Sequence, residues 1–391
     1  MNGQPTRQRD IDFWKGVGCL VMCLSHPLRV QIAIEQAGGP AMSPAVRLFI
    51  QTIEPFAVTF FMCSGLNAWT SATRRGRLSA RNDVFQIGAA LALFVLGFTY
   101  NLSLGVFHMG VSDIFQGIAL SAIAVYLVAR ISPTVGAYGI AAGVVFLVAG
   151  LVHSRLSPEH FDLYALPTRF FFAHFAFFPW AGFALFGVFL YLLDDGGRRK
   201  TAMAICAAML GVSLIFLTPN TTITQYQMFL RADASFMLTG AGATGLAMLW
   251  ARPRYEGRFA PWRVLEYTGR HSFLFLVHHF FILVILLAVR PTTMPPAVRA
   301  TLTVAIAFST LPLAVRLREW IVARKAGLVF SWLVLTLGSA ASLYLLFHAD
   351  APLLSMFAAY PAAYAFAVVY PDLRARMRKR WLTDAAPSPV A

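Results

Sequence analysis

The sequence predicts an all-α integral membrane protein, a polytopic helical bundle of about 12 (10–12) transmembrane helices with both termini in the cytoplasm. Of its 391 residues, 58% are apolar and only 13% are charged, whereas soluble domains carry about a quarter charged residues. Apolar blocks of about 20 residues, the length that crosses a bilayer as a helix, recur along the chain. These observations exclude a cytosolic enzyme, a disordered chain and a disulfide scaffold.

Each apolar block that is long enough to cross the hydrocarbon core marks one helix of the bundle. In chain order, the predicted spans are 14–34, 47–70, 83–103, 113–130, 134–153, 173–193, 200–217, 234–251, 270–289, 298–316, 326–347 and 352–370. Only His348, Ala349 and Asp350 separate the last two spans. No long polar insertion interrupts the series. We therefore expect a cytoplasmic N-terminal segment (1–13), a single transmembrane domain (14–370) and a basic cytoplasmic tail (371–391).

Positive charge alternates between the segments that connect these spans. With the N-terminus in the cytoplasm, the cytoplasmic segments hold 25 of the 32 Lys and Arg residues, as the positive-inside rule requires. The outer side keeps Arg29, Arg47, Arg155, Arg169, Arg231, Arg290 and Arg299. This bias accounts for the net charge of +15 without a nucleic-acid partner. Short loops and a plain N-terminus indicate a bacterial inner membrane.

Three of the nine histidines draw attention because ionisable groups at membrane depth usually line a cavity or a pathway. His26 follows an apolar run and precedes Pro27, which we expect to hold it near the outer surface. His278 and His279 lie roughly 12–15 Å into the ninth span at 1.5 Å per residue, near the midplane. A histidine at a helix end can be merely interfacial. Two adjacent rings at mid-span predict at least one polar partner or cavity.

Two acidic residues lie at the starts of spans. Asp113 opens the fourth span, and Gln116 follows three residues later. Asp113 belongs either to a polar site or to a simple helix N-cap. Glu54, next to Pro55, lies in the apolar stretch of the second span. A buried carboxylate there could orient a histidine ring, as carboxylates do in hydrolase triads. The four cysteines all fall inside apolar runs, so we expect no metal site.

Five short stretches occur in the same order as the motifs of a known superfamily. They are RDIDFWKG (9–16) with Met22 and His26 after it, AVTFFMCSG (57–65), DIFQGI (113–118), FPWAG (178–182) and GRHSFLFLVH (269–278). The chain thereby resembles the transmembrane acyltransferase superfamily, which includes the heparan-alpha-glucosaminide N-acetyltransferase-like proteins and the acyltransferase 3 family. The third and fourth stretches favour the first of these branches. Val58 and Phe275 depart from the proline and the tyrosine of the motifs.

The resemblance implies transfer of an acyl group from cytosolic acyl-CoA, with acetyl-CoA preferred, to a hydroxyl or amine of a sugar or glycan at the outer face. It makes His26 the general base, because an imidazole titrates near neutral pH. Asp113 or Glu54 would be its orienting partner, and His278 a cavity-lining or shuttle residue. Donor binding is expected from Arg270, Arg74, Arg75, Lys15 and His271, and acceptor binding from Gln116, Arg29, His174 and Trp180. The remaining partners are the lipid bilayer and, in a homodimer, a second copy.

A proton-coupled secondary transporter of the 12-helix type is the alternative. Both predicted termini inside and the basic loop at 73–77 fit that class, with Asp113, Glu54 and His278 as proton-coupling groups. The loop lacks the Asp of the major facilitator pattern, however, and the two halves of the chain show no repeat. A non-catalytic lipid or polysaccharide flippase is a third hypothesis. Consumption of acyl-CoA distinguishes the enzyme from both.

Overall fold

A computed structural model describes most of the chain. The described residues are 9–36, 38, 41–73, 79–103, 113–155, 177–216, 234–252, 260–289, 294–349 and 351–382. They form helices, and the chain divides into two compact units, Met1–Cys63 with Leu190–Leu313, and Ser64–Phe189 with Ala314–Ala391. The boundaries between units fall inside three helices, α3 (Thr59–Thr73), α9 (Phe177–Asp195) and α15 (Pro296–Val322).

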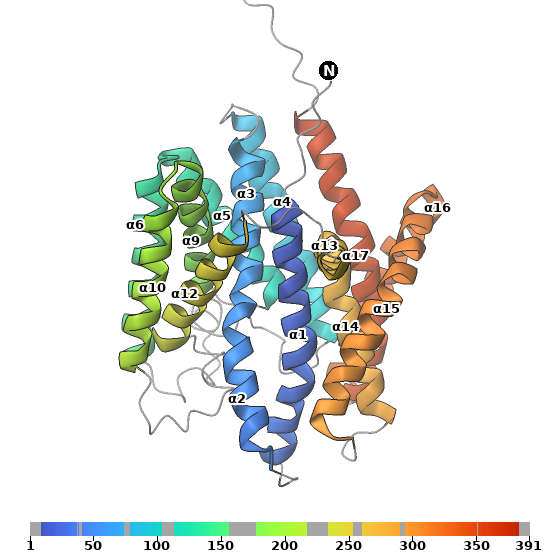
Figure 1. The fold of residues 1–391 in the computed structure, drawn as a ribbon. Helices are drawn as coiled ribbons and strands as arrows, with labels where there is room; N and C mark the ends of the chain where they lie inside the picture. Colours follow the sequence, from blue (N-terminus) through green and yellow to red (C-terminus); the bar gives the residue numbers. More distant parts are fainter. Residues whose placement is uncertain are drawn as a thin grey trace, which may run out of the picture. The chain divides into compact units, whose positions relative to one another are not determined.

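The first unit is built around α1 (Figure 1). Besides its parts of α3, α9 and α15, it contains α1 (Arg9–Gln36), α2 (Pro44–Ile53), η1 (Glu54–Val58), α10 (Arg199–Phe216), α12 (Ala234–Ala251), α13 (Ala260–Arg270) and α14 (Ser272–Val289). Helix α1 contacts α2, η1, α13 and α14, while α12 contacts η1 and α10. At the start of α2, Ser43 is the N-cap and Pro44 occupies the first turn, a combination that favours helix initiation.

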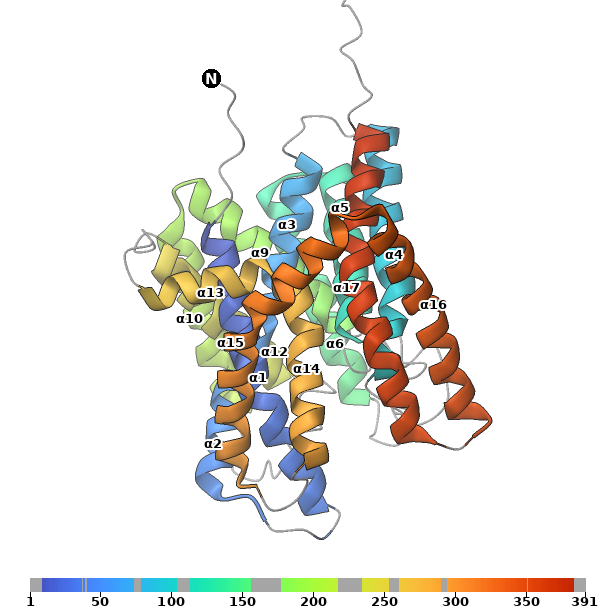
Figure 2. The same ribbon diagram turned by 90° about the vertical axis from the view of Figure 1, so that its right-hand side faces the viewer.

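Helix α13 lies across α1, and α14 then turns to run along it (Figure 2). The two helices meet at an angle of 97° around His271. The backbone N–H of His271 donates to the backbone carbonyls of Tyr267 and Thr268. Helix α13 lies before the ninth predicted span (270–289), in a stretch for which no span was predicted. Trp262, Leu265 and Gly269 recur at helical spacing, a pattern that indicates an amphipathic helix.

The second unit contains α4 (Ala80–Ser103), α5 (Ile114–Ile131), α6 (Val135–Arg155), α16 (Lys325–Phe347) and α17 (Pro352–Leu382). Helix α17 packs against α16 and α4, and α4 packs against α5. Phe115 lies at the centre of this core, with its ring 5.0 Å from that of Tyr100 and 5.1 Å from that of Phe366. Helix α17 continues to Leu382, so the predicted tail begins as a helix.

Each of the twelve predicted spans overlaps helical structure, the second of them (47–70) across α2, η1 and α3, which confirms the all-α, polytopic fold. Among the described residues, nine helices are long and apolar enough to cross a membrane, or up to ten if the bent pair α13–α14 forms one span. The total of twelve crossings and the cytoplasmic location of both termini stay predictions.

Candidate functional site

Two glycines bring the backbones of α1 and α13 into contact within the first unit. A Cβ atom at Gly16 would lie 1.9 Å from the carbonyl oxygen of Leu265, and one at Gly269 would lie 1.6 Å from that of Asp12. No side chain fits at these distances, so the approach requires glycine at both positions. The contact joins the first and the fifth motif stretches, which are about 250 residues apart in sequence.

At this end of the helix pair, two arginines share one buried carboxylate. Arg9 donates from Nε and Nη2 to the two oxygens of Glu266 at 2.9 and 2.8 Å, and Arg270 Nη2 donates to Oε1 at 3.2 Å. The side chain of Glu266 is 6% exposed, whereas those of Arg9 and Arg270 are 51% and 43% exposed. Two guanidinium groups against one carboxylate leave a net positive charge at an accessible surface, where phosphate groups bind well.

Lys15 lies in the second turn of α1, and His271 directly follows α13. Lys15 Nζ is 3.3 Å from the buried carboxylate of Asp12, and the ring of His271 packs 4.8 Å from that of Tyr267. The structure thus gathers three predicted donor-binding residues at one end of α1 and α13. Arg74 and Arg75 lie outside the described residues.

Arg9 and Glu266 are parts of this end that the sequence analysis did not assign. Arg9 appeared only as the first residue of a motif stretch. Glu266 lies four residues before Arg270, a spacing at which oppositely charged side chains meet on a helix. That spacing was a usable signal in the sequence. The pairing of Glu266 with Arg9, in contrast, depends on the packing of α13 against α1.

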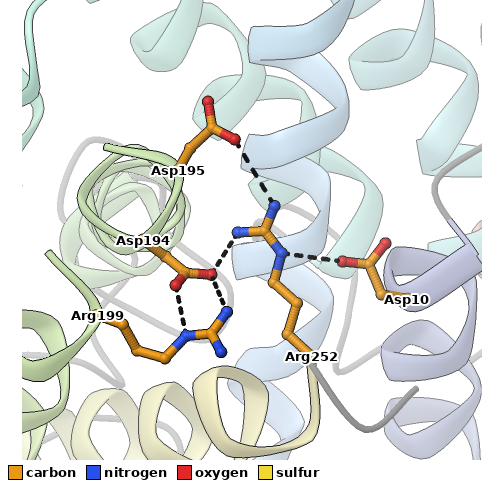
Figure 3. A network of polar contacts seen from close by, with 5 residues as sticks. All are labelled: Asp10, Asp194, Asp195, Arg199 and Arg252. Carbon is orange, nitrogen blue, oxygen red and sulfur yellow. Dashed lines mark hydrogen bonds and ion pairs between the residues drawn. The ribbon is translucent and has the colours of Figure 1, made fainter. Parts of the chain in front are cut away.

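A second charged cluster joins four helices of the same unit (Figure 3). Arg252, directly after α12, bonds Asp194 at 2.6 Å and lies 3.8 Å from Asp10 and 4.0 Å from Asp195. Arg199 donates to both oxygens of Asp194 at 2.6 and 3.0 Å. Three carboxylates face two guanidinium groups, so this cluster is not an anion site. It holds the ends of α1, α9, α10 and α12 on one side of the unit, in agreement with the predicted alternation.

Further along α1, His26 contacts His279 on α14. His26 Nδ1 is 3.0 Å from His279 Nε2, and the two rings are inclined by 24°. His279 is fully buried and its Nδ1 lies 3.0 Å from the carbonyl oxygen of Phe275. His26 therefore lies level with His279 in the helix bundle, and the depth of both rings in the membrane stays a prediction. Helix α1 does not end near Pro27 but continues to Gln36, since a bundle interior tolerates proline.

His278 contacts a different helix from its neighbour. Its Nε2 is 2.7 Å from Thr310 Oγ1 on α15, and that hydroxyl donates to the carbonyl of Ile306 at 2.6 Å. Adjacent residues on a helix point about 100° apart, so His278 faces α15 while His279 faces α1. The prediction that the mid-span pair has a polar partner is confirmed for both rings. A shuttle role for His278 stays a prediction.

Arg29 and Glu54 form an ion pair one turn beyond His26. Arg29 Nε donates to Glu54 Oε1 at 2.5 Å, and their side chains are 18% and 6% exposed. The pair links α1 to the 3-10 helix η1. The carboxylate predicted as a partner for a histidine is thus bonded to a guanidinium. Orientation of His26 by Glu54 and acceptor binding by Arg29 stay predictions.

The remaining predicted residues belong to the second unit. Asp113 and Gln116 form a capping box at the start of α5, in which Ile114 N donates to Asp113 Oδ1 at 2.5 Å and Asp113 N donates to Gln116 Oε1 at 3.1 Å. The N-cap interpretation of Asp113 is therefore confirmed. Trp180 is fully buried on α9. The roles of Asp113, Gln116 and Trp180 at a substrate stay predictions, and His174 lies outside the described residues.

Comparison with protein families identifies one relationship. Residues 7–230 match the family described as heparan-alpha-glucosaminide N-acetyltransferase, catalytic. The match covers more than half of the chain and contains His26, but it ends before α13 and α14 begin. Comparison with curated proteins and with solved structures returns no match.

Proposed function

The chain belongs to the heparan-alpha-glucosaminide N-acetyltransferase catalytic family, and from this premise we propose that it moves an acetyl group from acetyl-CoA to a hydroxyl or amine of a sugar or glycan. Membership in a membrane N-acetyltransferase family supports the reaction class. The donor, the acceptor and its attack from the outer face of a bacterial inner membrane are parts of the proposal, as is assembly as a homodimer.

One observation carries the proposal: a cationic end and a pair of contacting histidines lie along one helix, α1, which packs against α13 and α14. Arg9 and Arg270 mark one end, and His26 faces His279 further along. Fourteen residues separate Asp12 from His26 on α1, a distance of about 21 Å at 1.5 Å per residue. Acetyl-CoA is an extended molecule with a matching arrangement, since its phosphates lie at one end and its thioester at the other.

In this proposal, Arg9, Arg270, Lys15 and His271 bind the donor phosphates. His26 removes the proton from the acceptor O–H or N–H while the acceptor oxygen or nitrogen bonds to the thioester carbonyl carbon. The carbon–sulfur bond then breaks, and the leaving thiolate takes the proton back from the His26 imidazolium. Acetylated acceptor and CoA are the products, and no oxidant or metal enters the step. Acceptor binding is proposed for Arg29 on α1; Gln116 and Trp180 belong to the second unit, and His174 lies outside the described residues.

Calorimetric titration of the purified protein in nanodiscs with acetyl-CoA tests the donor site, and transfer of radiolabelled acetyl to amino sugars tests the reaction. We expect Arg270→Ala to weaken acetyl-CoA binding about tenfold or more, because a charged hydrogen bond is worth about 1.5–3 kcal/mol. His26→Ala should spare binding and reduce transfer by about 10²–10⁴-fold. Arg324→Ala is the matched control, because Arg324 is exposed and stacks on Trp320.

Absence of acetyl-CoA binding by a folded wild-type protein would overturn the proposal. The transporter alternative predicts a different result in sealed vesicles, where a substrate would dissipate a pH gradient without any CoA. Equal loss of binding in Arg270→Ala and Arg324→Ala would indicate a general charge effect and remove Arg270 from the donor site.

A further inference from the structure

The hydrogen bonds of His279 determine which nitrogen of each ring carries the proton. A carbonyl oxygen only accepts, so the contact with Phe275 O requires N–H at His279 Nδ1. Neutral His279 then has its lone pair on Nε2, the atom that faces His26 Nδ1. His26 Nδ1 must therefore be the donor of that bond, and the lone pair of neutral His26 lies on Nε2.

Packing restricts both rings to this arrangement. The ring of His279 is stacked on that of Phe275, with 5.5 Å between centroids and 11° between planes. His26 lies against His279 on α14, and its ring centroid is 4.6 Å from that of Phe280 on the same helix. Helix α14 thus supplies the carbonyl, the intermediate imidazole and a flanking aromatic ring from consecutive turns. A change of tautomer would break both hydrogen bonds of the chain.

We propose that His279 is the positioning residue for His26, and that the Phe275 carbonyl acts through it to make Nε2 the basic atom of His26. The proposal rests on the function above, in which His26 is the general base. The acceptor proton moves to His26 Nε2 and returns from there to the leaving thiolate. Throughout, His26 Nδ1–H continues to donate to His279, which stabilises the imidazolium as the carboxylate of a hydrolase triad does.

Two substitutions at position 279 test this role in the full-length protein. His279→Leu removes the acceptor for His26 Nδ1–H, and we expect kcat to fall about 10²-fold or more while the affinity for acetyl-CoA changes less than twofold. In His279→Gln the amide oxygen can accept the same hydrogen bond, so it should recover at least about tenfold of the lost kcat. His348→Gln is the matched control, because His348 is exposed at the end of α16.

Nitrogen-15 NMR of histidine-labelled wild-type protein gives a second test that does not depend on a variant folding. Both His26 and His279 should show the Nδ1–H tautomer, and His279→Gln should identify their signals. A neutral His279 with its proton on Nε2 would overturn the proposal. So would wild-type kcat in His279→Leu, or a kcat in His279→Gln no higher than in His279→Leu.

The outcomes also separate this inference from the function on which it rests. If His26→Gln is inactive while His279→Leu keeps full activity, His26 remains the base and the positioning role falls. Full activity of His26→Gln would remove His26 as the base. Absence of acetyl transfer by the folded wild-type protein would remove the proposed function itself.

Discussion

Arg29 and Glu54 place a buried ion pair within one turn of His26. Transfer of two charges out of water costs several kcal/mol, and their attraction repays this cost only where the geometry is good. A well-packed apolar pair would be as stable or more so. We therefore expect the main effect of this ion pair to be structural, because it attaches η1 to α1 beside His26.

Loss of the charge on the Glu54 carboxylate tests the importance of this ion pair. Glu54→Gln should lower the free energy of unfolding by about 3 kcal/mol, because the Arg29 guanidinium loses its charged acceptor in a buried place. The double substitution Arg29→Met with Glu54→Leu should recover most of this loss. Thermal unfolding in nanodiscs, followed by tryptophan fluorescence, measures both. A double variant that is less stable than Glu54→Gln would contradict the argument.

Helix α13 determines where two of the residues proposed to bind the donor come together. It carries Glu266 and Arg270, and its contact with α1 pairs Glu266 with Arg9. The 97° bend then directs α14 along α1, so that His279 reaches His26. The cationic end and the histidine pair therefore depend on the same glycine contact between α1 and α13.

A methyl group at position 269 tests the contact between α1 and α13. Gly269→Ala would place a methyl group 1.6 Å from the Asp12 carbonyl oxygen and 2.6 Å from Gly16 N. The helices must separate, so we expect a loss of about 3 kcal/mol or more in stability together with weakened acetyl-CoA binding. The control is Gly211→Ala on α10, where a Cβ would meet nothing within 4 Å; it should be neutral or stabilising by up to about 1 kcal/mol. Equal stability of the two variants would contradict the packing argument.

Along the whole chain, positive charge alternates between the segments that connect the predicted spans. The cluster of Asp10, Asp194, Asp195, Arg199 and Arg252 holds four helix ends of the first unit on one side. The spans of the second unit also coincide with helices. The predicted orientation assigns the side of that cluster to the cytoplasm.

Cysteine labelling in intact cells tests this orientation. The four native cysteines are buried and can be replaced to give a cysteine-free background. Ala41 and Ala323 are exposed in short connections between helices, and the predicted topology puts them on opposite sides. Ala41→Cys should react with a membrane-impermeant maleimide in intact cells, whereas Ala323→Cys should react only after permeabilisation. The reverse pattern would invert the orientation, and labelling of both in intact cells would contradict the span count.

The sequence by itself determined the helices and their order. The thickness of the bilayer sets the length that a helix needs to cross it. Apolar stretches of that length were therefore enough to locate helical structure at every predicted span. The Asp113 cap was also readable, because a capping box depends on residues three apart. Lys15 and Arg270, which are proposed to bind the donor, could be singled out from the sequence for the same reason, since both belong to short local motifs.

The contact between His26 and His279 became apparent only from the packing of the helices. Local sequence places a histidine on one face of a helix, but the ring that it meets is 253 residues away and depends on how α1, α13 and α14 pack. The two carboxylates proposed as its partner were plausible by charge, yet Glu54 bonds Arg29 and Asp113 caps α5. Such long-range pairings follow from close packing between helices, in this case through Gly16 and Gly269, and helical periodicity carries no information about them.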